Sequence, residues 1–228
     1  MRTNNIDQFY GLPQNRILEV DVNGGEPTAS KNYKKILANL PENTIIVRMN
    51  TNGSRMIKEL EGILSKRVMV IVTLSFDGVE DTHDYVRWPI KWKNYVDNVK
   101  QYQNLQKQFP LLKLNSWTTV SCLNVANLPN ILDFTTEHNI DHDWAFLNTP
   151  NVFHVKHRNR FTEFAKHRLQ TSSYEQCRKI SESVAVGQNN DAELMDKIKQ
   201  QDTLRGIDYK NYFNLDPNFS KNNEAKRS

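Results

Sequence analysis

Two adjacent glycines and a glutamate form the most unusual group of residue types in this sequence. Gly24, Gly25 and Glu26 follow the apolar stretch 17–22, and Pro27 comes directly after them. Glycine allows the positive φ angles that a tight turn needs, but a turn does not need a carboxylate in the next position. Glu26 and the backbone carbonyls beside it offer only hydrogen-bond acceptors, and Pro27 would hold them rigid. Together they could form a cradle for a cation such as an ammonium group. In the alternative interpretation, Glu26 is an acid in the first turn of a helix, where the helix dipole favours negative charge.

Similar small and polar residues follow each of the other predicted strands. Apolar stretches alternate with helical patterns, and this alternation predicts parallel strands joined by helices. The strands are expected at 17–22, 44–49, 67–76, 112–122 and 143–148. The carboxyl ends of parallel strands share one rim, where α/β proteins bind their ligands. Residues of these types are also common in any strand-to-helix turn, so their convergence has an ordinary explanation as well.

The fold class predicted from this pattern is α/β. Residues 1–150 form a partial (β/α) barrel with parallel strands, whose helices are expected at 30–40, 54–65, from Pro89 onward and at 128–138. The apolar run at 67–76 is typical of a strand that is buried on both faces. Beyond residue 150 the strand pattern ends. Residues 151–228 are predicted to be a mainly helical extension, with helices at 160–170, 174–186 and 191–201 and a disordered tail.

The composition excludes several classes of protein. No window contains 18 uninterrupted apolar residues, so we expect no membrane span, and the absence of an apolar signal segment favours the cytoplasm. The net charge of +4 is small and its basic residues are spread along the chain, which gives no support for a nucleic-acid partner. Cys122 and Cys177 are the only cysteines. Two cysteines exclude a disulfide framework and a self-sufficient zinc or iron–sulfur site of cysteine type, and no metal site is predicted.

The residues after the strands resemble motifs of the radical S-adenosylmethionine (radical SAM) superfamily. The sequence has GGEP at 24–27, NTNG at 50–53, and SFDG at 75–78 with Arg87 following after eight residues. These motifs stand in the order and at the spacing of successive βα units, and the likeness runs from about residue 17 to 150. It is greatest for the branch that carries C-terminal twitch or SPASM extensions. The resemblance implies a partial barrel that lacks its first βα unit.

The resemblance also implies roles for individual residues. Gly24, Gly25 and Glu26, with Pro27, would receive the methionyl ammonium of S-adenosylmethionine. Arg87 would bind the methionyl carboxylate through two parallel hydrogen bonds, although an arginine on a solvated loop is the alternative. The other residues assigned to the cofactor site are Ser75 at the ribose or carboxylate, Asn50, Asn52 and Asp77 at the rim, and Thr119 and Leu147 at the nucleoside.

The superfamily's chemistry requires a [4Fe–4S] cluster, held by three cysteines in a C-x3-C-x2-C segment before GGEP. No cysteine precedes Gly24, and Cys122 and Cys177 lie elsewhere in the chain. Without the cluster no 5′-deoxyadenosyl radical forms, so no residue is assigned a catalytic role. Three explanations are open: a truncated or split gene product, a separate chain that supplies the cluster segment, or a remnant without catalysis. Residues 151–228 contain only Cys177, so auxiliary clusters are not assigned either.

The predicted function is therefore a radical SAM enzyme, or a fragment of one, that is inactive without the cluster segment. It would generate a 5′-deoxyadenosyl radical to modify an unknown substrate, for which a peptide is the candidate. One alternative is a non-catalytic α/β binding or scaffold protein. Another is an unrelated parallel α/β enzyme that binds a phosphorylated small molecule at the same rim. If the first βα unit is missing, the strand at 17–22 has an unpaired edge, and we expect the chain to self-associate.

Overall fold

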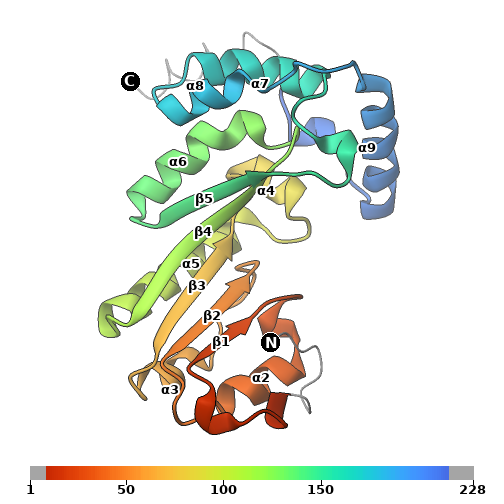
Figure 1. Ribbon diagram of the computed structural model, residues 1–228. Helices are drawn as coiled ribbons and strands as arrows, with labels where there is room; N and C mark the ends of the chain where they lie inside the picture. The colour runs from red at the N-terminus through yellow and green to blue at the C-terminus, as the bar shows by residue number, and fades with distance from the viewer. Residues whose placement is uncertain (1–8, 216–228) are drawn as a thin grey trace. The chain divides into compact units, whose positions relative to one another are not determined.

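Strands and helices alternate along the chain as the sequence pattern predicts. The computed structural model describes residues 9–215 (Figure 1). Five parallel strands form one open sheet in the order β1-β2-β3-β4-β5, which confirms the α/β class. The strands are β1 (Glu19–Val22), β2 (Ile46–Thr51), β3 (Met69–Ser75), β4 (Leu112–Val120) and β5 (Asp141–Phe146).

Short and long helices connect and follow these strands. The α-helices are α2 (Lys31–Ala38), α3 (Leu60–Leu64), α4 (Glu80–Val86), α5 (Trp92–Gln108), α6 (Leu128–Glu137), α7 (Arg160–Gln170), α8 (Glu175–Ser181) and α9 (Asp191–Arg205). The 3₁₀ helices are η1 (Gln14–Arg16), η2 (Pro27–Ala29), η3 (Val125–Asn127), η4 (Asn151–Phe153) and η5 (Tyr209–Asn211). Within residues 9–215, no helix has the length and hydropathy that crossing a bilayer would require.

The chain divides into two units. Unit 1 comprises the residues up to Ser75 together with Lys93–Trp117, and unit 2 comprises Phe76–Trp92 and the residues from Thr118 onward. In unit 1, the paired strands bury alternate side chains on one face, and Val47, Val70 and Leu112 are fully buried. Helix α5 buries Tyr95, Val99, Tyr102 and Leu105, which follow one another at three- and four-residue steps along one face of the helix.

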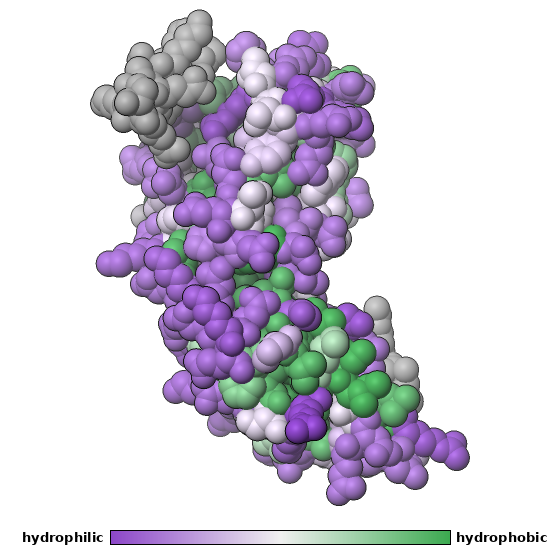
Figure 2. Space-filling view, turned by 90° about the vertical axis from the view of Figure 1, so that its left-hand side faces the viewer, coloured by the Kyte–Doolittle hydropathy of each residue, from purple (hydrophilic) through white to green (hydrophobic). Residues whose placement is uncertain are grey.

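Strand β3 is not buried on both faces, contrary to the expectation from its continuous apolar run. Val70, Val72 and Leu74 are fully buried, whereas the alternate residues Ile71 and Thr73 are partly exposed. The apolar run therefore reflects one buried face and one half-covered face. Apolar surface also occurs at the strand starts, where Leu18 and Ile45 are 55% and 57% exposed. Figure 2 shows apolar surface in the lower half of the view, where Figure 1 places β1 and β2.

Between β2 and β4, three helices differ from the sequence prediction. Helix α3 occupies only the last part of the expected stretch 54–65, and α4 lies where a loop was expected. The helix expected to open at Pro89 begins at Trp92, whose backbone N–H donates to the Asp84 carboxylate (2.6 Å). The start of α5 is thus fixed by the Asp84 carboxylate, which lies outside the helix, and not by Pro89 as predicted.

Unit 2 is mainly helical beyond residue 150, as predicted. Its core includes a cluster of Cys122, Phe153, Phe161, Leu194 and Ile198. Helix α7 has the predicted bounds, and Asn159 and Thr162 form a reciprocal capping box that fixes its start. The predicted helix at 174–186 is shorter, and the one at 191–201 extends to residue 205. The predicted tail lies at 216–228, outside the described residues.

Candidate functional site

The Gly24–Gly25 turn follows β1 in unit 1 and has an unusual backbone. Gly24 has φ +99° and Gly25 has φ +61°, which L-amino acids with a side chain rarely adopt. A Cβ atom added at either position would meet no other atom within 4 Å. The glycines are therefore needed for the backbone conformation, and the space beside them is open. Among the described residues, no donor reaches the carbonyl oxygens of Gly24 or Gly25, so the turn presents two unpaired acceptors.

The carboxylate of Glu26 is tied to two segments of unit 1. Its Oε1 accepts hydrogen bonds from the backbone N–H (3.2 Å) and the hydroxyl (2.8 Å) of Thr28. The same oxygen accepts a bond from the Thr51 hydroxyl (2.9 Å), and Oε2 accepts one from the Asn52 backbone N–H (2.7 Å). A carboxylate offers about four lone-pair positions, and these four hydrogen bonds already match that number.

Glu26 thus caps η2 and holds the end of β2 at the same time. This geometry is close to the alternative interpretation, in which the glutamate serves the start of a helix. The role of Glu26 as a direct acceptor for a ligand ammonium stays a prediction. The carbonyls of Gly24 and Gly25 are the acceptors that the geometry leaves open.

The structure brings three more predicted residues of unit 1 to this turn. Asn50 donates from its side chain to the side-chain oxygen of Asn23 (2.7 Å), directly before the glycines. Asn52 accepts from the Ser54 N–H through its side-chain oxygen (2.9 Å). Pro27 is buried as the first residue of η2. Ser75, at the end of β3, is half-buried and makes none of these contacts.

A second group of predicted residues meets in unit 2. Arg87 lies 2.7 Å from the Asp77 carboxylate through Nη2, and the other oxygen of Asp77 accepts the Thr119 backbone N–H (2.8 Å). Burial raises the pKa of Asp77, while the Arg87 charge and the Thr119 hydrogen bond act in the opposite direction. Arg87 is therefore not a solvated loop arginine. Its Nε is buried without a hydrogen-bond partner among the described residues, and a role of Arg87 in binding the methionyl carboxylate stays a prediction.

His83, one helical turn before Arg87, was missed at the sequence level. It is fully buried, and its pKa is lowered to about 4 by burial and by the Arg87 charge. Its ring lies 5.3 Å from the Trp92 ring, which in turn stacks on Phe76 at 5.8 Å. The i, i+4 spacing to Arg87 could have identified this histidine, but only if the helix α4 had been predicted.

Leu147 belongs to the core of unit 2. Its backbone N–H donates to the Val120 carbonyl (2.8 Å), and its side chain packs against the cluster that contains Cys122 and Phe161. This placement gives Leu147 a packing role, and a contact with a nucleoside stays a prediction.

The residues described by the structure do not fit an iron–sulfur cluster. Cys122 and Cys177 are both buried and free, and burial raises the pKa of each thiol, whereas cluster ligands must be thiolates. Residues 9–215 also contain no group of three or more histidine, cysteine or acidic side chains arranged to hold a metal.

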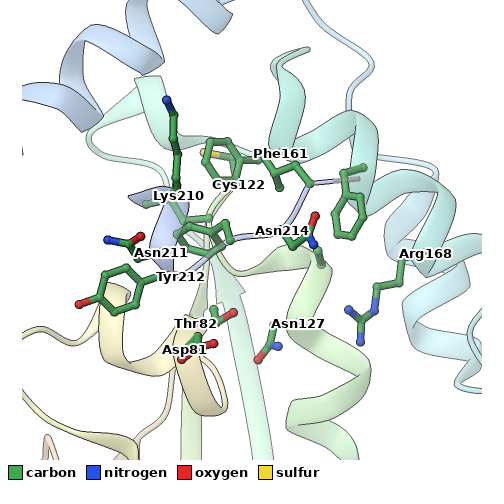
Figure 3. Close-up of a pocket in the computed structure, with 15 residues that line it drawn as sticks. Asp81, Thr82, Cys122, Asn127, Phe161, Arg168, Lys210, Asn211, Tyr212 and Asn214 are labelled. Carbon is green, nitrogen blue, oxygen red and sulfur yellow. The ribbon is translucent and has the colours of Figure 1, made fainter. Parts of the chain in front are cut away.

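A cavity of about 260 Å³ lies in unit 2, and Cys122 is among the residues that line it (Figure 3). Phe161, Phe164 and Phe213 contribute apolar walls. Thr82 and Asn127 lie together at one side, where the Asn127 side chain accepts the Val79 backbone N–H (2.7 Å). None of the predicted site residues lines this cavity.

Comparison with known proteins gives limited information. No family model matches this sequence, and no curated protein matches it. Solved structures that resemble the chain include Streptococcus suis SuiB bound to S-adenosylmethionine (16% identity, TM-score 0.47) and Streptococcus suis SuiB (15% identity, TM-score 0.48). Each comparison covers 83% of this chain, which spans only 36% and 37% of the SuiB chains. Likeness at this level carries no assignment of function.

Proposed function

We propose that this chain binds S-adenosylmethionine and that the Gly24–Gly25 turn receives the amino group of its methionyl part. The observation that carries the proposal is the pair of unpaired carbonyl acceptors, beside open space, in a turn that only glycine accommodates. An ammonium group has three donors and no acceptor, so it complements such a turn. The GGEP, NTNG and SFDG motifs add the resemblance to the radical SAM superfamily, and within it to the branch with twitch or SPASM extensions.

The same acceptors argue against the phosphorylated ligand considered above. Phosphate oxygens are hydrogen-bond acceptors and carry negative charge. The turn carbonyls are also acceptors with a partial negative charge, and the Glu26 carboxylate carries a full negative charge. A phosphate at this turn would meet repulsion from the Glu26 carboxylate. The site chemistry therefore favours a cationic amine over a phosphate.

The second part of the proposal is that the bound S-adenosylmethionine takes part in radical chemistry. It requires a cluster whose ligands the described residues do not provide, so we propose the chain as a binding part that needs a cluster segment from elsewhere. When bound, such a cluster would supply the electron that cleaves S-adenosylmethionine. The 228-residue chain alone is expected to bind the cofactor without releasing 5′-deoxyadenosine. Release of 5′-deoxyadenosine by the purified chain would contradict this division of roles. A peptide as the substrate stays a prediction.

The Gly25→Ala variant tests the binding proposal. Alanine at φ +61° is strained by roughly 1–2 kcal/mol, so the turn should change its shape and S-adenosylmethionine affinity should fall about tenfold. Titration calorimetry would measure this affinity, with methylthioadenosine as a ligand that lacks the amino group. Its affinity should be the same for the variant and the wild type.

The matched control is Gly62→Ala. Gly62 lies in α3, has no positive φ and has no neighbour within 4 Å of an added Cβ. This variant should bind S-adenosylmethionine like the wild type and melt at the same or a slightly higher temperature. Equal affinities of Gly25→Ala and Gly62→Ala for S-adenosylmethionine would refute the assignment of the turn.

A further inference from the structure

Thr51, the threonine of NTNG, to which the sequence analysis assigns no role, holds a central position beside the Glu26 carboxylate. The residue is the last of β2, and it is 1% exposed. Its hydroxyl donates to Glu26 Oε1 (2.9 Å) and accepts the Gly53 backbone N–H (3.2 Å). Both hydrogen-bonding functions of the hydroxyl are therefore used, one toward the glycine turn and one toward the next loop.

That next loop is fixed in turn to helix α5. The side-chain amide of Asn98 donates to the Gly53 carbonyl (2.8 Å). Gly53 has φ +69°, and a Cβ added there would lie 2.5 Å from the ring of Tyr95, which is 1% exposed. Only glycine fits between this buried ring and the loop. At Gly53, the loop after β2 is thus held to α5 by one hydrogen bond and one close packing contact.

We propose that Thr51 is a positioning residue for the Gly24–Gly25 turn. It connects the loop fixed by α5 to Glu26, and Glu26 in turn fixes the residues that follow the two glycines. We call the group of Glu26, Thr51, Gly53, Tyr95 and Asn98 the turn brace; all five lie in unit 1. The role of the brace in ligand binding rests on the proposed function.

The physical reason for a brace is preorganisation. Gly24 and Gly25 are exposed, and glycine has the greatest conformational freedom of any residue. If this freedom had to be lost on binding, the ligand affinity would fall by the corresponding entropy. A carboxylate that is already held by Thr28, Thr51 and Asn52 restricts the end of the turn before any ligand arrives.

The test compares three variants of the full 228-residue chain. Thr51→Val keeps the shape of the side chain and removes the hydroxyl, whereas Thr51→Ser keeps the hydroxyl. Thr44→Val is the matched control, since Thr44 is also buried in unit 1 and its hydroxyl has no hydrogen-bond partner among the described residues. One readout needs no ligand: hydrogen exchange of the Asn52 amide, which donates to Glu26 Oε2. The other is the affinity for S-adenosylmethionine by calorimetry.

In Thr51→Val we expect exchange of the Asn52 amide to accelerate and S-adenosylmethionine affinity to fall roughly fivefold. Thr51→Ser and Thr44→Val should both behave like the wild type. If the Asn52 amide exchanges at the same rate in Thr51→Val and in Thr44→Val, the brace is refuted, whatever the ligand affinity of the two variants. If its exchange accelerates but its affinity is unchanged, the positioning role is refuted. If the wild type does not bind S-adenosylmethionine, the proposed function fails, while the exchange data still decide the brace.

Discussion

At the scale of single residues, the structure separates groups that present acceptors from groups that hold other groups in place. Gly24 and Gly25 present unpaired carbonyls, whereas the Glu26 carboxylate accepts hydrogen bonds from neighbouring donors. Asp77 similarly holds one nitrogen of Arg87. Residue type alone predicts that an acid and an arginine matter here, but only the partners show which of them remains available to a ligand.

The Asp77–Arg87 pair leads to a prediction about stability. The side chains are 11% and 24% exposed, and removing Arg87 would leave a buried carboxylate without its counter-charge. We expect Arg87→Met to lower the free energy of unfolding at neutral pH by about 3 kcal/mol. Chemical denaturation measures this value.

Arg158→Met is the control for this effect. Arg158 pairs with Glu163, and both side chains are at least half exposed, so the loss should stay below about 1 kcal/mol. Equal losses in the two variants would show that the Asp77–Arg87 pair does not function as a buried ion pair.

At the scale of elements, α4 is the helix that the sequence pattern did not reveal. It is only seven residues long and begins with charged residues, so it has too few apolar positions for a clear helical period. Yet it places His83 in a fully buried position, and Arg87 is its C-cap residue. Aromatic packing of Trp92 against Phe76 and Phe134 covers the same region of unit 2.

The burial of His83 predicts that stability depends on pH. The folded state holds this histidine neutral with a pKa of about 4, whereas the unfolded chain has the ordinary value of 6.5. As the pH falls, the unfolded state therefore binds a proton before the folded state does. The contribution of neutral His83 to the free energy of unfolding is fully present above pH 6.5 and is lost as the pH drops toward 4. The expected loss that depends on His83 is about 3 kcal/mol across this window.

Thermal melts of His83→Gln between pH 7 and 4 would test this expectation. The variant should start less stable than the wild type but lose less stability as the pH falls. His167→Gln, at an exposed position of α7, should keep the wild-type slope. A wild-type slope in His83→Gln would mean that other groups cause the acid sensitivity.

At the scale of the whole molecule, the sheet ends at β1, which pairs only with β2 among the described strands. A strand edge with free N–H and C=O groups invites pairing with another chain. Leu18 adds an apolar side chain, 55% exposed, directly before this strand. These observations agree with the expected self-association, which stays a prediction.

Leu18→Lys should reduce such association, because a charge beside an edge strand opposes strand pairing between chains. Size-exclusion chromatography with light scattering, over a tenfold range of concentration, would measure it. Leu204→Lys is the control, since Leu204 is 87% exposed on α9 and lies in the other unit. A wild-type protein that stays monomeric over the whole range would contradict the expectation.

The sequence by itself determined the order of the strands, the order of the α-helices other than α4, and the location of the glycine turn. These features depend on local periodicity and on the backbone preferences of residues next to each other, as at Gly24–Gly25 and along α5. The tertiary structure alone decided that β3 has a half-open face and which partners the polar residues have. Glu26 meets Thr51, and Asp77 meets Thr119, only because parallel strands bring distant parts of the chain side by side. No local pattern specifies a hydrogen bond between residues so far apart in the chain.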